Sequence, residues 1–378
     1  MEIFWSCITT VIACTYTVLH LNVPEQREGK DRDRGWKGDL KWWWIGLWPS
    51  IKWTLICLFV PEYYTAVAAQ EFLRARKTLN KLKALPKNRH PPFGYSKAHA
   101  WFANMGGFAV RQCTLPDLTS TVLGMSTEHF AALDGREVVR LLRMEEASST
   151  LQLPLPTEAD ILDRSKADAF AKGLAALQIF YFCASCVIRA TKRLPIALIE
   201  IGTVGYALCS LVSYGFLFHK PSSIKTPITL ANLENDSSPI HREVFRHSGP
   251  YRRDKIGNGF SNDLWQQFVV YLWAGSLLLG AFHVAGLNSA FPTPFPTPVD
   301  EWLWRSCSIA LAFLPCLIPA TAYYFPDDIP GWSPQSSLVN GLYYFLRMVL
   351  IVEMIRCLFY LPPGAFVTTW ATYVPHIG

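Results

Sequence analysis

The sequence predicts an all-α polytopic membrane protein, a bundle of about seven transmembrane helices with a small cytosolic α+β insertion between the second and third spans. Three observations predict this class. Charged residues make up 17% of the 378 residues, whereas soluble domains average about 25%. Uncharged stretches long enough to cross a bilayer alternate with strongly charged loops. Hydrophobic residues reach 51% and aromatic residues 14%, which excludes a disordered or collagen-like chain.

Each predicted span is an apolar stretch with the length of a membrane helix. The spans cover residues 3–21, 42–60, 170–188, 194–218, 264–285, 302–324 and 338–361. The first follows Met1 and Glu2 without a basic leader, so it is interpreted as a retained helix rather than a cleaved signal peptide. The second begins at three consecutive tryptophans, a pattern typical of the membrane interface. Pro61 predicts its end or a kink.

The spans divide the chain into three parts. Residues 1–90 hold two spans and a basic helical extension, residues 91–156 form a small extramembrane domain, and residues 157–378 hold five spans and the C-terminal tail. In the middle part, residues 101–110 predict a strand or turn around a glycine pair, and residues 126–143 predict a capped amphipathic helix. The insertion is therefore expected to combine helix and strand.

The distribution of lysine and arginine predicts the orientation. Basic residues crowd segments 74–89 and 220–255, which are expected to face the cytoplasm, and the Pro-rich loop 286–299 has none. This arrangement puts the N-terminus in the cytoplasm, with the endoplasmic reticulum as the expected membrane. One loop is an exception, because the six Lys and Arg residues of segment 22–41 then face the lumen. The glycosylation acceptor at Asn235 is expected to face the cytoplasm and to stay unmodified.

Several chemistries have no motif in this sequence. We find no Asp-rich magnesium cluster, Gly-rich phosphate loop, nucleophile elbow or His-pair metal motif. No metal and no cofactor are therefore predicted. Cys183 and Cys186 form a C-x-x-C pair inside a span, interpreted as two small apolar neighbours rather than a redox or metal pair. A net charge of +6 does not favour nucleic-acid binding, so the expected partners are the lipid bilayer and a small molecule.

Ionisable residues at membrane depth are functional candidates by default, because each costs at least about 2.5 kcal/mol at a helix centre. The candidate catalytic acids are Glu200, Glu353 and Glu62. The candidate substrate-binding residues are Arg189, Tyr206, Trp273, His283 and Arg347. Glu200 has apolar neighbours, so its carboxyl is expected to keep its proton and to be a potential general acid.

For each candidate a structural alternative stays open. Glu200 has possible ion-pair partners in Arg189 and Lys192 across a tight turn. Glu353 lies three residues before Arg356, a spacing that favours a structural ion pair on one helix face. His283 is either a general base or a packed interfacial side chain. The aromatic residues either line a cavity that stabilises a carbocation or face lipid and the membrane interface.

Several segments resemble a recurrent pattern in fungal multi-span membrane proteins. They are Asp163 to Asp168, Lys172, Gln178, Arg189, Leu194-Pro195-Ile196, Glu200, Lys220-Pro221, Phe4-Trp5-Ser6-Cys7, Asn22-Val23-Pro24 and Met105-Gly106-Gly107-Phe108. Some such proteins are similar to the integral-membrane terpene cyclases of fungal meroterpenoid pathways, of the ascochlorin, ascofuranone and macrophorin type. The resemblance touches the first 221 residues.

This resemblance implies a metal-free cyclisation. The substrate would be a farnesyl chain on an aromatic or epoxycyclohexenone headgroup, and the reaction would begin by protonation of an epoxide or a terminal olefin. Glu200 is the acid inside the matched intramembrane block and is the expected proton donor, tuned by Arg189 or Tyr206. Two other functions stay open: a membrane acyltransferase of secondary metabolism with His283 as base, and a non-catalytic scaffold or transporter-like protein whose buried charges are ion pairs.

Overall fold

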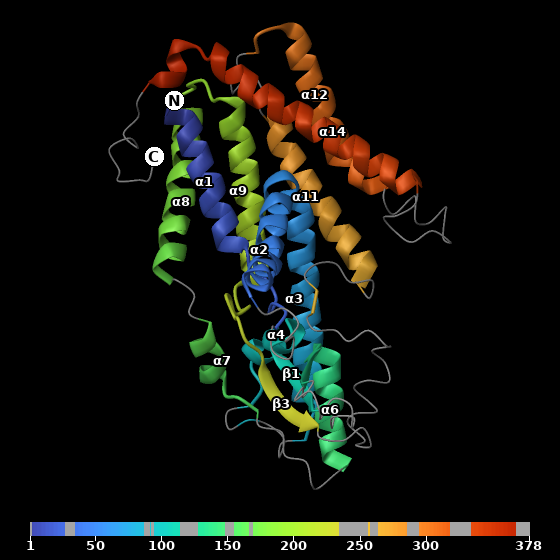
Figure 1. The fold of residues 1–378 in the computed structure, drawn as a ribbon. Coiled ribbons are helices and arrows are strands. Elements are labelled where there is room, and N and C mark those ends of the chain that lie inside the picture. The colour runs from blue at the N-terminus through green and yellow to red at the C-terminus, as the bar shows by residue number, and fades with distance from the viewer. Residues whose placement is uncertain are drawn as a thin grey trace.

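The structure is a computed structural model, which describes residues 2–26, 35–86, 91, 94–113, 128–147, 155–165, 169–233, 256–257, 264–285, 295–317 and 334–367. Long helices form a bundle at one end of the molecule, and a small α/β unit lies at the other (Figure 1). The N-terminus lies at the end of the bundle that is remote from the α/β unit. Asn235 lies outside the described residues.

A helix occupies each of the predicted span positions. The bundle consists of α1 (Glu2–Val18), α2 (Trp36–Phe59), α3 (Pro61–Lys83), α8 (Ala169–Thr191), α9 (Leu198–Leu217), α11 (Trp265–Ala285), α12 (Pro298–Phe313) and α14 (Pro334–Cys357). Short 3₁₀ turns follow at Leu314–Cys316, Leu358–Tyr360 and Pro363–Phe366. In the described part of the chain, α8, α9 and α11 are long and apolar enough to cross a membrane, and the α2–α3 pair makes a fourth span only if its two bent helices count as one. A count of seven spans stays a prediction.

The α/β unit contains α4 (Lys97–Asn104), β1 (Phe108–Cys113), β2 (Glu128–Leu133), α6 (Gly135–Ala147), α7 (Glu158–Arg164) and β3 (Ile228–Leu233). The strand order is β2-β1-β3. Strand β1 pairs antiparallel with β2, Phe108 facing Leu133, and parallel with β3, where a bulge lies between Ala109 and Val110. The expected mixture of helix and strand is confirmed.

Two details of this unit differ from the sequence-based prediction. The sheet takes its third strand from residues 228–233, outside the predicted domain at 91–156, because β1 offers a free edge that a distant segment can pair with. The helix predicted over 126–143 begins only at Gly135. The oxygen Oδ1 of Asp134 accepts the backbone N–H groups of Arg136 and Glu137 at 2.8 and 2.9 Å, so this side chain starts the helix and frees the preceding residues for β2.

Helix α3 joins the bundle to the α/β unit. Near its start, Tyr64 and Val67 are buried in the core of the bundle. At its other end, Leu82 packs into the core of the unit with Phe108 and Leu133. One continuous helix therefore fixes the distance between the two cores.

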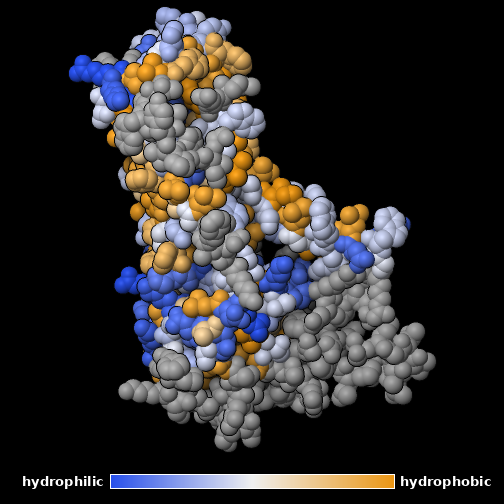
Figure 2. Space-filling model, turned by 90° about the vertical axis from the view of Figure 1, so that its left-hand side faces the viewer, coloured by the Kyte–Doolittle hydropathy of each residue, from blue (hydrophilic) through white to orange (hydrophobic). Residues whose placement is uncertain are grey.

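Helix α2 leaves the bundle sideways. It meets α3 at Pro61 with a bend of 116°, which confirms the predicted kink: proline at the first position of α3 has no N–H group with which to continue α2. Figure 1 shows α2 close to end-on, and in Figure 2 an arm projects from the apolar part of the bundle and slopes toward the more polar part near the α/β unit.

Candidate functional site

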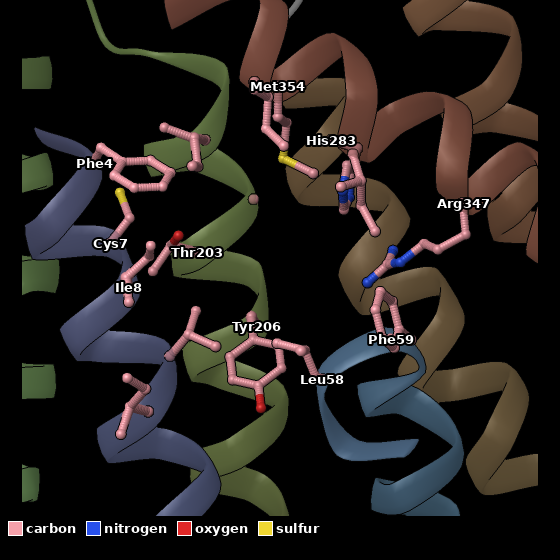
Figure 3. A pocket seen from close by; sticks show the side chains of 16 residues that line it. Phe4, Cys7, Ile8, Leu58, Phe59, Thr203, Tyr206, His283, Arg347 and Met354 are labelled. Carbon is pink, nitrogen blue, oxygen red and sulfur yellow. The ribbon is translucent and has the colours of Figure 1, made fainter. Parts of the chain in front are cut away.

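A cavity of about 410 Å³ lies between α1, α9, α11, α14 and the C-terminal end of α2 (Figure 3). Pockets for small organic ligands usually measure roughly 300–1,000 Å³. Most of the lining is apolar, and its polar members are Cys7, Thr203, Tyr206, His283 and Arg347. Such a cavity suits a mostly hydrocarbon ligand that carries one polar end.

Glycines on α9 bring the neighbouring helices close to the cavity. A Cβ atom at Gly202 would lie 2.6 Å from Sδ of Met354 on α14, and one at Gly205 would lie 2.9 Å from Leu279 on α11. Both distances are shorter than any ordinary contact, so a side chain at either position would displace the side chain of Met354 or Leu279. Small residues at helix contacts allow this approach in membrane bundles.

His283 is held in a fixed orientation at the polar end of the cavity. Its Nδ1 lies 2.7 Å from the carbonyl oxygen of Leu279, so Nδ1 carries the proton and donates to that oxygen, which leaves Nε2 as an acceptor in the neutral ring. The indole of Trp304 donates to the carbonyl oxygen of His283 at 3.0 Å, and the two rings lie 5.5 Å apart. The histidine is thus both packed, as the structural alternative predicted, and part of the cavity lining.

Arg347 extends from α14 toward Phe59 and His283 (Figure 3). Arg347 is only 8% exposed. Within the described part of the chain, its guanidinium makes no hydrogen bond and no ion pair, although its charge acts on Glu62 and His283. A buried guanidinium is costly until an acceptor satisfies its donors. Arg347 can therefore hold an anionic or hydroxylated end of a ligand.

Glu62, the second residue of α3, is buried within range of the charge of Arg347. It is 2% exposed, and its Oε2 has no hydrogen-bond partner among the described residues. Gly275 of α11 packs against it: a Cβ atom at Gly275 would lie 3.1 Å from Cβ of Glu62. Tertiary packing thus brings Glu62, His283 and Arg347 into one buried polar cluster, although Glu62 itself is not a lining residue.

The structure assigns Glu200 a structural contact. Glu200 is 7% exposed. Its Oε2 accepts a hydrogen bond from the backbone N–H of Ala197 at 2.7 Å, and this bond caps α9. Arg189 makes no ion pair with it, because the guanidinium donates to the carbonyl oxygens of Pro195, Ala365 and Val367 at 2.7, 2.7 and 3.3 Å. Glu200 is buried as expected but lies outside the cavity lining, so the structure does not favour it as the proton donor.

Substitution of Glu200 should separate capping from catalysis. Glu200→Ala is expected to lower the free energy of unfolding by about 1 kcal/mol, because loss of a cap typically costs that much. Glu200→Gln keeps an oxygen acceptor and is expected to retain both stability and activity. Thermal unfolding in detergent and a turnover assay would measure the two effects. If Glu200→Gln lost all activity at unchanged stability, Glu200 would be the acid after all.

Two predicted substrate-binding residues behave differently. The ring of Tyr206 lines the cavity, but its hydroxyl is bound to Oγ1 of Thr15 at 2.7 Å and to Sγ of Cys57 at 3.3 Å, so it does not tune Glu200. Trp273 is 44% exposed on α11 and lies outside the lining. The structure therefore does not place Trp273 in this cavity, and its role in substrate binding stays a prediction.

The remaining candidate acid, Glu353, forms one ion pair. Arg356 Nε lies 3.5 Å from Oε2 of Glu353, and the same guanidinium also pairs with Asp300. The ion-pair alternative for Glu353 is confirmed. Among the described residues, no three His, Cys, Asp or Glu side chains gather where they could hold a metal ion.

Comparison with known proteins gives a family but no activity. A family of unknown function, DUF8562, matches residues 1–241. The chain belongs to this family. The match contains Glu62, Thr203 and Tyr206, whereas His283 and Arg347 come from beyond it. No curated protein and no solved structure matches the chain.

Some lining residues escaped the sequence-based prediction, among them Cys7, Phe59 and Thr203. A signal for α9 was present: Ile199, Gly202, Thr203 and Tyr206 recur at spacings of three and four, so they share one helix face. No comparable signal linked that face to Arg347, which lies more than a hundred residues later in the chain.

Proposed function

We propose that this chain is an enzyme of the endoplasmic reticulum membrane that cyclises a prenyl (farnesyl) chain of a meroterpenoid, starting with protonation of an epoxide or olefin. The observation that supports this most strongly is the cavity, which combines a hydrocarbon lining with a buried polar cluster at one end. Three apolar helices long enough to cross a bilayer are compatible with a membrane-dissolved substrate.

The lining suits both parts of a prenylated substrate. Arg347 and His283 would bind the end of the substrate that carries the epoxide or olefin to be protonated. Ile8, Val11 and Ile199 would contact the prenyl chain. Aromatic faces stabilise a nearby cation by about 0.5–2 kcal/mol; Phe4, Phe59 and Tyr206 are the aromatic residues that line the cavity.

In this proposal Glu62 replaces Glu200 as the acid. Of the three candidate acids, Glu200 caps a helix and Glu353 lies 3.5 Å from the Arg356 guanidinium. The Oε2 atoms of Glu62 and Glu353 both lack a hydrogen bond among the described residues, but Glu62, unlike Glu353, has no cation within ion-pair distance there. Because Glu62 does not line the cavity, its proton would pass through one bridging water. It would reach the epoxide oxygen as the C–O bond breaks.

The same polar cluster also offers a base for the end of the reaction. The electron pair of the neighbouring olefin forms the new C–C bond, and the resulting cation loses a proton to Nε2 of His283. The product is an isomer of the substrate, and proton transfer from His283 back to Glu62 through solvent restores the site.

An assay in membranes tests the proposal. Microsomes that contain the chain are expected to convert a farnesylated phenol epoxide into a product of equal mass that lacks the epoxide. Chromatography and mass spectrometry would measure this conversion. Ile199→Trp fills the cavity and should lower conversion at least tenfold. The matched control Leu211→Trp lies on the same helix and is 44% exposed, so it should retain full conversion. Equal conversion by both variants, or none by the unaltered chain, would contradict cyclisation in this cavity.

One observation favours a second function. Nε2 of His283 is an acceptor beside an apolar cavity, which is also what an acyltransferase needs to deprotonate an acceptor hydroxyl. An acyl-CoA assay separates the two functions, because acyl transfer releases free thiol and adds the acyl mass to the acceptor.

A further inference from the structure

The bend between α2 and α3 limits how deeply α2 enters the bilayer. The 24 residues of α2 form a helix about 36 Å long at 1.5 Å per residue. With α3 along the membrane normal and a bend of 116°, α2 rises by only about 16 Å. This is half of a hydrocarbon core that measures about 30 Å.

The depth of α3 agrees with this estimate. Nζ of Lys220, just beyond α9, lies 2.7 Å from Oε2 of Glu71 on α3, which marks the polar boundary of the bundle at that level. From Pro61 to Glu71, α3 rises about 15 Å. The junction of α2 and α3 thus lies near the middle of the bundle, where Phe59 lines the cavity.

Contacts of the segment before α2 identify the side from which the chain arrives. The N–H of Val23 donates to the carbonyl oxygen of Met105 in the α/β unit at 3.0 Å. Nε2 of Gln26 donates to the carbonyl oxygen of Lys225 at 2.9 Å. The chain therefore lies at the α/β unit before α2 begins, and α3 returns it to that unit.

We propose that α2 and α3 form a re-entrant pair, and that the first half of α2 lies in the phospholipid headgroup layer on the side of the α/β unit. Trp36, Trp43, Trp44 and Trp48 are 72, 60, 50 and 49% exposed, and tryptophan concentrates at this layer. Lys37 and Lys41 precede the tryptophan run and would meet lipid phosphates. The arm in Figure 2 leaves the apolar part of the bundle and slopes toward the level at which polar residues begin.

A re-entrant pair reverses the predicted orientation of the N-terminus. Helix α1, whose 17 residues measure about 26 Å, then makes the one membrane crossing that precedes the α/β unit, so its start faces the lumen when that unit is cytoplasmic. The six Lys and Arg residues of segment 22–41 move to the cytoplasmic side together with segments 74–89 and 220–255. The single exception to the positive-inside rule in this chain disappears.

Glycosylation mapping in microsomes tests this topology on the full chain. One variant carries an N-terminal extension with an Asn-Xaa-Thr acceptor, and another carries a spacer with the same acceptor inserted after Gly29. A re-entrant pair predicts that the first is glycosylated and the second is not. The opposite pattern would show that α2 spans the membrane. The natural acceptor at Asn235 is the internal control and should stay silent; its modification would overturn the cytoplasmic position of the α/β unit.

A second measurement does not depend on inserted sequence. The full chain is reconstituted in vesicles with bromine atoms near the headgroups or near the chain ends of the lipids, beside a variant with Trp43→Phe, Trp44→Phe and Trp48→Phe. The fluorescence difference between the two proteins reports these three tryptophans. We expect at least twofold stronger quenching by the shallow bromines. Equal or stronger quenching by the deep bromines would rule out a headgroup position for α2.

Discussion

Replacing Glu62 by glutamine is expected to lower the rate of cyclisation by about 100-fold or more, because an amide cannot supply the proton and general acid catalysis typically contributes 10²–10⁴-fold. Glutamine has nearly the same shape and keeps the packing against Gly275. Substrate binding at Arg347 should therefore change little, so the loss should appear in kcat rather than in KM. Initial rates over a range of substrate concentrations in microsomes would measure both.

The matched control is Glu158→Gln, an exposed acid at the start of α7 in the α/β unit. It should retain the full rate. Glu200→Gln, measured in parallel, distinguishes the two buried carboxyls. Should Glu62→Gln keep more than half of the activity, Glu62 would not be the acid; a parallel loss in thermal stability would instead indicate a structural role.

Replacing Lys220 by methionine is expected to lower the free energy of unfolding by about 3–5 kcal/mol, the usual effect of removing one member of a buried ion pair. The side chains of Lys220 and Glu71 are only 1% and 11% exposed. Methionine fills the space but leaves the Glu71 carboxylate without its cation. The ammonium group also lies 5.9 Å from the ring of Trp101, so the α/β unit should loosen with it. Thermal unfolding in detergent would show the shift.

Two comparisons identify the cause of this loss. Lys225→Met removes an exposed lysine of the same loop and should leave the transition within about 0.5 kcal/mol of the unaltered chain. The double variant Glu71→Leu, Lys220→Met removes both charges and should recover most of the loss, because replacement of a buried pair by apolar residues is often neutral. A double variant as unstable as Lys220→Met alone would show that packing, not the charge pair, is responsible.

Helix positions were accessible from the sequence because hydropathy is a local property. Runs of apolar residues predicted a helix at every span position, and Pro61 predicted the break that the structure contains. The course of the chain through the membrane at α2 and α3 could not be predicted in this way. The tryptophan-rich α2 has the length of a span. Only the 116° bend and the contacts of Val23 and Gln26 indicate that the chain enters α2 from the side of the α/β unit and returns to that side through α3.

The candidate site was likewise predicted only in part: the sequence singled out its ionisable residues but not their contacts. Glu62, His283 and Arg347 each stood out as ionisable residues in apolar surroundings, as did Glu200 and Glu353. The sequence did not distinguish them, because a partner such as the Ala197 N–H or the Arg356 guanidinium, and a place beside the cavity, depend on rotamers and on neighbouring helices. The parallel strand β3 was missed for the same reason, since its partner lies more than a hundred residues away.

By itself, the amino-acid order of this protein determined its helical class, the helix positions, the presence of a mixed α/β insertion and the short set of buried charges worth testing. Periodicity, hydropathy and the conformational limits of proline act within a few residues, so they can be read along the chain. Only the tertiary structure decided which of those charges share a cavity, which are satisfied by a cap or an ion pair, and which side of the bundle α2 comes from. These depend on close approach between segments that are far apart in the chain, where glycines such as Gly202 and Gly275 let helices meet.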